Sequence, residues 1–138
     1  MAKVKLPTSK DLERLEKFFK RNDKLDPKTV NLNDNRILES FDWTGLIEEK
    51  EAILDLLKAY QRLVRIVPGG THETVKALMK AGIHSATQIA SLPRKHFILS
   101  NTQFFENNTT LAEMCYANAV ACRSRLLVRF METNSTGP

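Results

Sequence analysis

The stretch LMKAGIHSATQIASLPRKHF, residues 78–97, has the sequence of two short helices joined by a tight turn. Gly82 stands where the first helix should end, because glycine takes the left-handed backbone of a helix C′ position with little steric cost. Ile83 follows and should pack back onto the hairpin, while His84 or Ser85 should cap the second helix. The stretch therefore predicts a helical hairpin with Gly82 at a positive φ angle.

Helical periodicity continues before this hairpin. The segment LIEEKEAILDLLKAYQRLVRIV, residues 46–67, places apolar residues at 3.6-residue spacing and predicts the long central helix of the core. The sequence PGG, residues 68–70, should stop it. A shorter helix over residues 71–82, capped by Thr71, should then lead into the turn.

Further helices are expected towards both ends of the chain. Residues 7–21, PTSKDLERLEKFFKR, have capping residues followed by an apolar stripe, and one or two helical turns are expected around residues 37–41. Thr110 and Glu113 fit a capping box that opens the last helix. The apolar stripe of that helix comprises Leu111, Cys115, Ala119, Cys122, Leu126 and Phe130.

No segment shows the sustained alternation of a strand, so the predicted fold class is all-α. We expect a single compact helical bundle of about five or six helices with a helix-hairpin-helix-like element. The bundle should occupy residues 1–132 as one domain, and residues 133–138 should form a disordered tail.

Composition limits the classes of protein to consider. The chain has 138 residues, a net charge of +5 and only two cysteines. We expect no membrane span, since no apolar run is long enough, and no classical signal peptide, which fits the cytoplasm or export by another route. Cys115 and Cys122 lie two turns apart on one predicted helix, too far to bond to each other there, and are expected to be reduced thiols in the core.

Residues that could carry chemistry are sparse. The three histidines, His72, His84 and His96, are spaced twelve apart but fall at different helix edges. The sequence HETVK, residues 72–76, lacks the second histidine of the zinc helix motif, and PGGTHET lacks the lysine of a phosphate loop. We therefore expect no catalytic residue, no cofactor and no metal site, and the chain is not predicted to be an enzyme.

The hairpin leaves two functions open. Hairpins that bind nucleic acid commonly have two glycines in the turn, so that backbone N–H groups reach a phosphate, but here His84 replaces the second glycine. The segment thus looks like a degenerate helix-hairpin-helix, which in other proteins is either structural or nucleic-acid-binding. If it binds nucleic acid, the candidate contacts are Lys76, Lys80, Gly82, His84, Arg94 and Lys95.

The pattern LxxxQRLxR at residues 57–65, the run AGIHSA at residues 81–86 and the pattern A..(I/C)Y..A at residues 112–119 resemble a helical module. That module belongs to the A subunits of bacterial insecticidal toxin complexes and related large virulence-associated proteins. The resemblance covers residues 47–130. It rests on an LxxxQRLxR helix, a proline-containing break, the run AGIHSA and a final helix with A..(I/C)Y..A. The matching residues are Leu57, Gln61, Arg62, Leu63 and Arg65 in the first motif and Ala112, Cys115, Tyr116 and Ala119 in the last.

Those subunits are giant chains that build a pore and shell, so their translocation activity does not transfer to 138 residues. The resemblance implies a non-enzymatic helical structural or protein-interaction module, as part of a secreted toxin-like assembly or its cargo. The expected partner is another protein or a second copy of the chain. The alternative is a nucleic-acid-binding helix-hairpin-helix domain.

Overall fold

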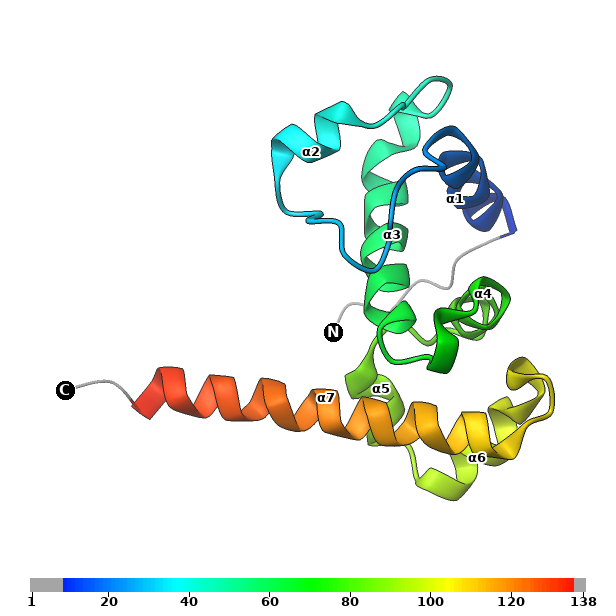
Figure 1. The fold of residues 1–138 in the computed structure, drawn as a ribbon, viewed down its shortest axis with the longest axis vertical. Helices are drawn as coiled ribbons and strands as arrows, with labels where there is room; N and C mark the ends of the chain where they lie inside the picture. Colours follow the sequence, from blue (N-terminus) through cyan, green and yellow to red (C-terminus); the bar gives the residue numbers. More distant parts are fainter. Residues whose placement is uncertain (1–8, 136–138) are drawn as a thin grey trace.

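The structure is a computed structural model that describes the backbone of residues 9–135 and the side-chain surroundings of residues 10–125. The described backbone has no strand, which confirms the all-α prediction, and five of its helices have at least seven residues. The helices are α1 (Ser9–Arg21), α2 (Asn35–Ser40), α3 (Lys50–Val64), α4 (His72–Lys80), α5 (Ala86–Ser91), α6 (Arg94–Asn101) and α7 (Thr109–Ser135) (Figure 1). Three short 3₁₀ turns lie between them, η1 (Ile47–Glu49), η2 (Pro68–Gly70) and η3 (Thr102–Phe105).

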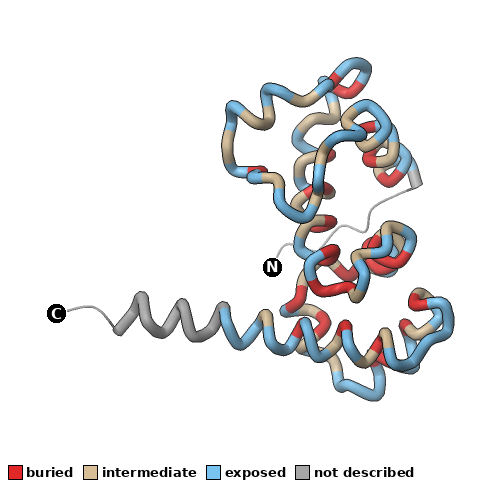
Figure 2. Tube along the Cα trace, in the orientation of Figure 1, coloured by how far each residue is buried: buried red, intermediate tan, exposed pale blue. Residues whose placement is uncertain are grey.

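Helix α3 is the centre of the core, as its periodicity predicts. Leu57 and Leu63 are fully buried, while Leu56 is only partly buried at the edge of the stripe. The burial of α3 alternates along the tube in Figure 2, with buried and exposed positions on opposite faces. Each fully buried leucine removes enough apolar surface from water to contribute about 1.5–3 kcal/mol.

The ends of the central helix differ from the predicted range of 46–67. Its start is the separate 3₁₀ turn η1, and the α-helix proper begins only at Lys50. Its end comes at Val64, and Val67 is already extended with ψ 122°. Val67 precedes Pro68, and the proline ring disfavours helical backbone in the residue before it.

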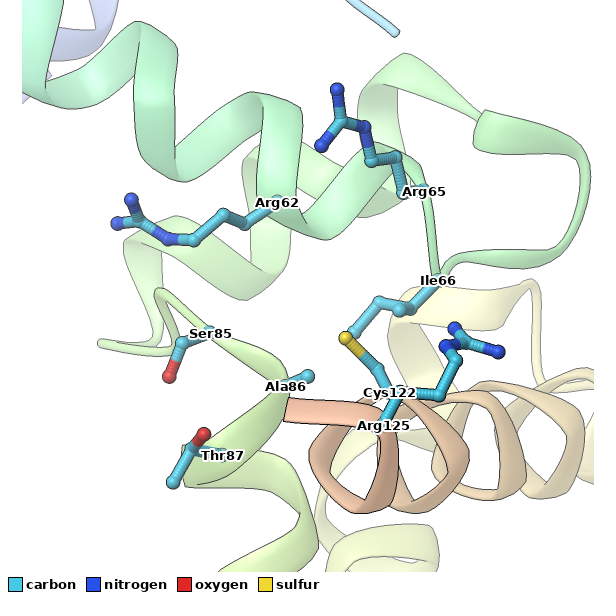
Figure 3. A pocket seen from close by; sticks show the side chains of 8 residues that line it. All are labelled: Arg62, Arg65, Ile66, Ser85, Ala86, Thr87, Cys122 and Arg125. Carbon is cyan, nitrogen blue, oxygen red and sulfur yellow. The ribbon is translucent and has the colours of Figure 1, made fainter. Parts of the chain in front are cut away.

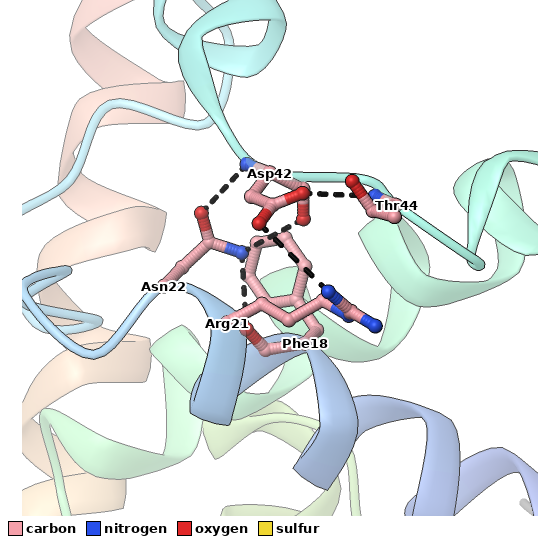
Figure 4. Close-up of polar contacts among 5 residues, drawn as sticks. All are labelled: Phe18, Arg21, Asn22, Asp42 and Thr44. Carbon is pink, nitrogen blue, oxygen red and sulfur yellow. Dashed lines mark hydrogen bonds and ion pairs between the residues drawn. The ribbon is translucent and has the colours of Figure 1, made fainter.

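The end of α1 is tied to a distant loop by a small polar cluster, shown in Figure 4. The Asn22 side chain donates to the Phe18 carbonyl (3.0 Å) and the Asp42 carbonyl (3.2 Å), and it accepts from the Asp42 N–H (2.8 Å). Asp42 in turn accepts from the Thr44 N–H at 3.0 Å, and Arg21 lies 3.9 Å from its carboxylate. These bonds fix the loop that brings Trp43 onto the core beside Phe18, with 5.0 Å between ring centroids.

Helix α7 crosses the lower end of α3 and packs mainly on α5 and α6 (Figure 1). Ala112 and Ala119 are fully buried, and their small side chains let the neighbouring helices approach closely. The C-terminal half of α7 extends away from the other helices, and residues 123–125 are exposed.

The predicted cap of α7 was wrong, and the predicted cap of α4 is correct in position only. Asn108, not Thr110, caps α7, because its side-chain oxygen accepts from the Leu111 N–H at 3.3 Å. The left-handed residues Glu106 and Asn107 end the preceding turn and place Asn108 at the cap position. Thr71 occupies the cap position of α4, but its side chain makes no capping hydrogen bond.

The structure describes only part of the two chain ends for which predictions were made. Helix α7 continues through Ser135, so residues 133–135, expected to begin a disordered tail, are helical. Residues 136–138 and 1–8, like the expected stripe side chains Leu126 and Phe130, lie outside what the structure describes. In the described part of the chain, no helix is both long and apolar enough to cross a bilayer.

Candidate functional site

The predicted hairpin forms between α4 and α5. Helix α4 ends at Lys80, and Gly82 follows with φ 92°, the left-handed backbone that the sequence predicts there. Ile83 is buried, and the hydroxyl of Ser85 accepts from the Gln88 N–H at 3.2 Å to cap α5. Of the two caps left open by the sequence, the structure uses Ser85.

The backbone donors of the turn are engaged within the chain. The Gly82 N–H donates to the Met79 carbonyl and the Ile83 N–H donates to the Leu78 carbonyl, both at 3.0 Å. The His84 N–H donates to the side-chain oxygen of Gln88 at 2.6 Å. A phosphate at this turn would have to displace these bonds.

Two carbonyls of the turn are engaged as well. The Gln88 amide donates to the Gly82 carbonyl at 3.2 Å. The Gln88 side chain therefore bonds to both a donor and an acceptor of the turn backbone. Nε of Arg62, on α3, donates to the His84 carbonyl at 3.1 Å. The turn is therefore held by α5 and by the central helix.

The side chain of His84 does not present a cation. Its Nε2 is buried and has no hydrogen-bond partner among the described residues. Burial lowers the pKa of the imidazole, and the nearby Arg62 guanidinium lowers it further. Since the ordinary pKa of histidine is already below 7, His84 is neutral at physiological pH.

The four basic candidates lie on two helices and have different partners. Lys76 on α4 lies 3.4 Å from the Glu16 carboxylate of α1, and Arg94 on α6 lies 3.7 Å from Glu113 of α7. Lys80 and Lys95 are exposed. Two of the four cations are thus next to carboxylates of other helices.

A chain of hydrogen bonds that no sequence pattern predicts, here called the relay, joins α3, α4 and α1. The Tyr60 hydroxyl lies 2.9 Å from Nδ1 of His72, and Nε2 of His72 bonds to Glu16. Burial and, to a lesser extent, the charges of Glu16 and Glu73 together raise the pKa of Tyr60 to about 12. A tyrosine that keeps its proton so firmly is a hydrogen-bond donor, not a nucleophile.

The remaining chemistry-bearing residues are separate from one another. Cys115 is fully buried, and burial raises the pKa of its thiol to about 12, while Cys122 is half-buried. Both are free thiols. Over the described residues, no group of three or more His, Cys, Asp or Glu side chains is arranged to hold a metal ion.

The most distinctive surface feature is a groove beside the hairpin, which we call the arginine groove (Figure 3). It has a volume of about 430 Å³ and lies between the end of α3, the start of α5 and α7. Its lining residues are Arg62, Arg65, Ile66, Ser85, Ala86, Thr87, Cys122 and Arg125. Its side chains combine an apolar floor with a basic rim.

This groove could not be predicted from the sequence, because its lining comes from three separate segments. Arg62 and Arg65 also lie near the end of the central helix, where cations are expected to offset the helix dipole. Their spacing of three residues, with apolar Ile66 directly after, is the one local signal of a basic edge beside apolar surface.

Comparison of the chain with protein-family models, with curated proteins and with solved structures finds no match.

Proposed function

We propose that the chain is a non-enzymatic helical module that supports an assembly or binds another protein. The observation that carries this proposal is the closed hairpin turn, in which the N–H groups of Gly82, Ile83 and His84 all bond within the chain. These three donors cannot hold a phosphate unless their bonds within the chain are broken. Its position under Arg62 of the central helix supports a structural role for the hairpin.

The absence of reactive geometry among the described residues supports the non-enzymatic part of the proposal. Tyr60, His72 and Glu16 form a chain of hydrogen bonds, but the tyrosine at its end is held in its protonated form. The buried thiol of Cys115 is likewise protonated at neutral pH, and only a thiolate is an effective nucleophile.

The resemblance of residues 47–130 to the toxin-complex A subunits adds a context to this proposal. In that context the module would be part of a secreted toxin-like assembly or would be carried by it. Its partner would then be another protein of the assembly or a second copy of the chain.

The competing function is nucleic-acid binding, and a salt-controlled titration separates the two. A labelled DNA duplex of about 20 bp is titrated with the protein at about 150 mM salt, and fluorescence anisotropy is recorded. We expect only weak binding that falls steeply as salt rises, as for any chain of net charge +5.

Submicromolar affinity at this salt concentration, abolished when Lys80 and Lys95 are both changed to Glu, would overturn the proposal. The matched control changes Lys10 and Lys58 to Glu, since these lysines lie outside the hairpin and give the same change in net charge. A loss of binding in both double variants would instead indicate a general charge effect without a site.

A further inference from the structure

The arginine groove is unusual because its cations lack carboxylate partners. Arg14, Arg21 and Arg94 each lie within 4.0 Å of a carboxylate elsewhere in the described chain. The groove has three arginines and no acidic residue in its lining. Its charge is therefore uncompensated within the described residues.

Two of these arginines are held in place by backbone carbonyls. Nε of Arg62 donates to the His84 carbonyl and Nε of Arg65 donates to the Lys28 carbonyl, both at 3.1 Å. A guanidinium has five N–H donors, so each of these bonds leaves the terminal nitrogens for a ligand. An oriented guanidinium loses less conformational entropy when it binds a carboxylate than a freely rotating one does.

The arrangement of the guanidinium groups restricts the kind of ligand. Figure 3 shows the side chains of Arg62, Arg65 and Arg125 pointing in different directions. They do not converge on one point, as a site for a single phosphate or sulfate would require. Negative groups spaced along an extended ligand would match them better.

The floor of the groove adds a second requirement. Ile66, Ala86 and Cys122 supply apolar surface between the arginines. A volume of about 430 Å³ lies within the range of pockets that take a small number of ligand groups. Burying apolar side chains there would contribute to affinity, whereas a phosphate group offers no apolar surface to bury.

We propose that the arginine groove docks an acidic amphipathic segment of a partner protein. An apolar side chain of the segment enters the groove, and its carboxylates meet Arg62, Arg65 and Arg125. The inference rests on the proposed function and names the chemistry of the partner. A second copy of the chain is disfavoured as the occupant, because it carries the same positive net charge.

The probe is a fluorescein-labelled synthetic peptide of about 16 residues, with leucines at i, i+3, i+4 and i+7 spacing and glutamates at most other positions. One control peptide has lysine in place of every glutamate, and a second has serine in place of every leucine. Binding is measured by anisotropy at about 150 mM salt, and amide chemical shifts locate the contact.

Two variants test the groove, and each has a matched control. Arg125→Glu reverses one charge at the rim, and Lys95→Glu makes the same change on exposed α6. Thr87→Phe fills the groove from an exposed position on α5, and Thr110→Phe adds the same bulk at an exposed position on α7. Far-UV circular dichroism and the free energy of unfolding verify that each variant is folded.

The expected result is binding of the acidic peptide alone, with shifts at Ile66, Ala86 and Cys122. Arg125→Glu and Thr87→Phe should each weaken the affinity by about fivefold or more, because rim charge and floor both contribute. The controls should stay within about twofold of the original chain. Failure of the acidic peptide to bind, or equal weakening in variants and controls, would overturn the inference.

The DNA titration described above, run in parallel, distinguishes this failure from failure of the proposed function. If neither peptide nor duplex binds, the inference about the groove is wrong and the structural module stands. If the duplex binds with submicromolar affinity and shifts the groove residues, both the inference and the proposed function are wrong.

Discussion

The hairpin turn and the arginine groove lie side by side and share Arg62. They differ in whether their polar groups have partners within the chain. In the turn, Gln88 and Arg62 bond to the backbone of Gly82 and His84, so these backbone groups are satisfied within the chain. In the groove, Arg65 and Arg125 have no carboxylate partner among the described residues.

This contrast shows where binding function should be sought. A buried polar group without a partner costs free energy, so the backbone bonds made within the turn stabilise this part of the fold. Exposed charges that a fold orients but does not neutralise are available to a ligand. We therefore propose that the hairpin motif is a structural element and that the adjacent groove is the candidate surface for binding.

The largest expected effect is a difference in the free energy of unfolding between two substitutions on helix α5. Ile89 of α5 is fully buried under the hairpin, so Ile89→Ala should lower the free energy of unfolding by about 2–5 kcal/mol. Thr87 is exposed in the groove, and Thr87→Ala should change it by no more than about 0.5 kcal/mol. Urea unfolding of both variants measures the difference, and similar values for the two would contradict the assignment of the faces.

A smaller effect is expected at the turn itself. Gly82 has φ 92°, so the Cβ of Gly82→Ala would strain the backbone and destabilise the fold by about 1–2 kcal/mol. Lys80→Ala, on the exposed end of α4, is the control and should be nearly neutral. Thermal or urea unfolding checks both, and an unchanged stability of Gly82→Ala would refute the left-handed turn.

The smallest expected effect on stability concerns Glu16, the partly exposed end of the Tyr60–His72–Glu16 relay. Burial alone would raise the pKa of Glu16, but the hydrogen bond and charge of His72, together with Lys76, hold it below its ordinary value. A carboxyl whose pKa is lowered by folding stabilises the fold above its ordinary pKa. This contribution is lost as the pH falls through the lowered pKa.

Glu16→Gln should therefore destabilise the chain near neutral pH and lose its effect in acid. Because the Glu16 side chain is 36% exposed, solvent screening limits the difference to less than about 1 kcal/mol. Glu13→Gln on the exposed face of α1 is the control. Unfolding free energies measured across the acidic pH range test this, and a Glu16→Gln effect that grew as the pH fell would reverse the sign of the argument.

Features determined by adjacent residues could be predicted from the sequence. The positive φ of Gly82 and the burial of Leu57 and Leu63 follow from local backbone preference and periodicity. The prediction of the α7 cap failed because Asn108 and Thr110 are both good capping residues. The left-handed residues Glu106 and Asn107, which place Asn108 at the cap, have no clear sequence signal.

Features built from distant segments could not be predicted. The pairing of Glu16 with His72 joins residues 56 positions apart, and the bond from Arg65 to Lys28 spans 37. Periodicity indicates which face of a helix is buried, but not which helix it meets. The groove depends on how α7 crosses the end of α3. In the sequence, where this packing is unknown, its arginines are separate residues with no visible relation.

The most direct test of the closed turn is amide hydrogen exchange at Gly82, Ile83 and His84. We expect all three amides to be protected, because each donates to an acceptor within the chain. In Gln88→Ala, protection should fall most at His84, whose acceptor is removed, while Ile83 keeps its bond to Leu78. Exchange of all three amides at the rate of an unfolded peptide in the original chain would contradict the account and reopen the turn as a phosphate site.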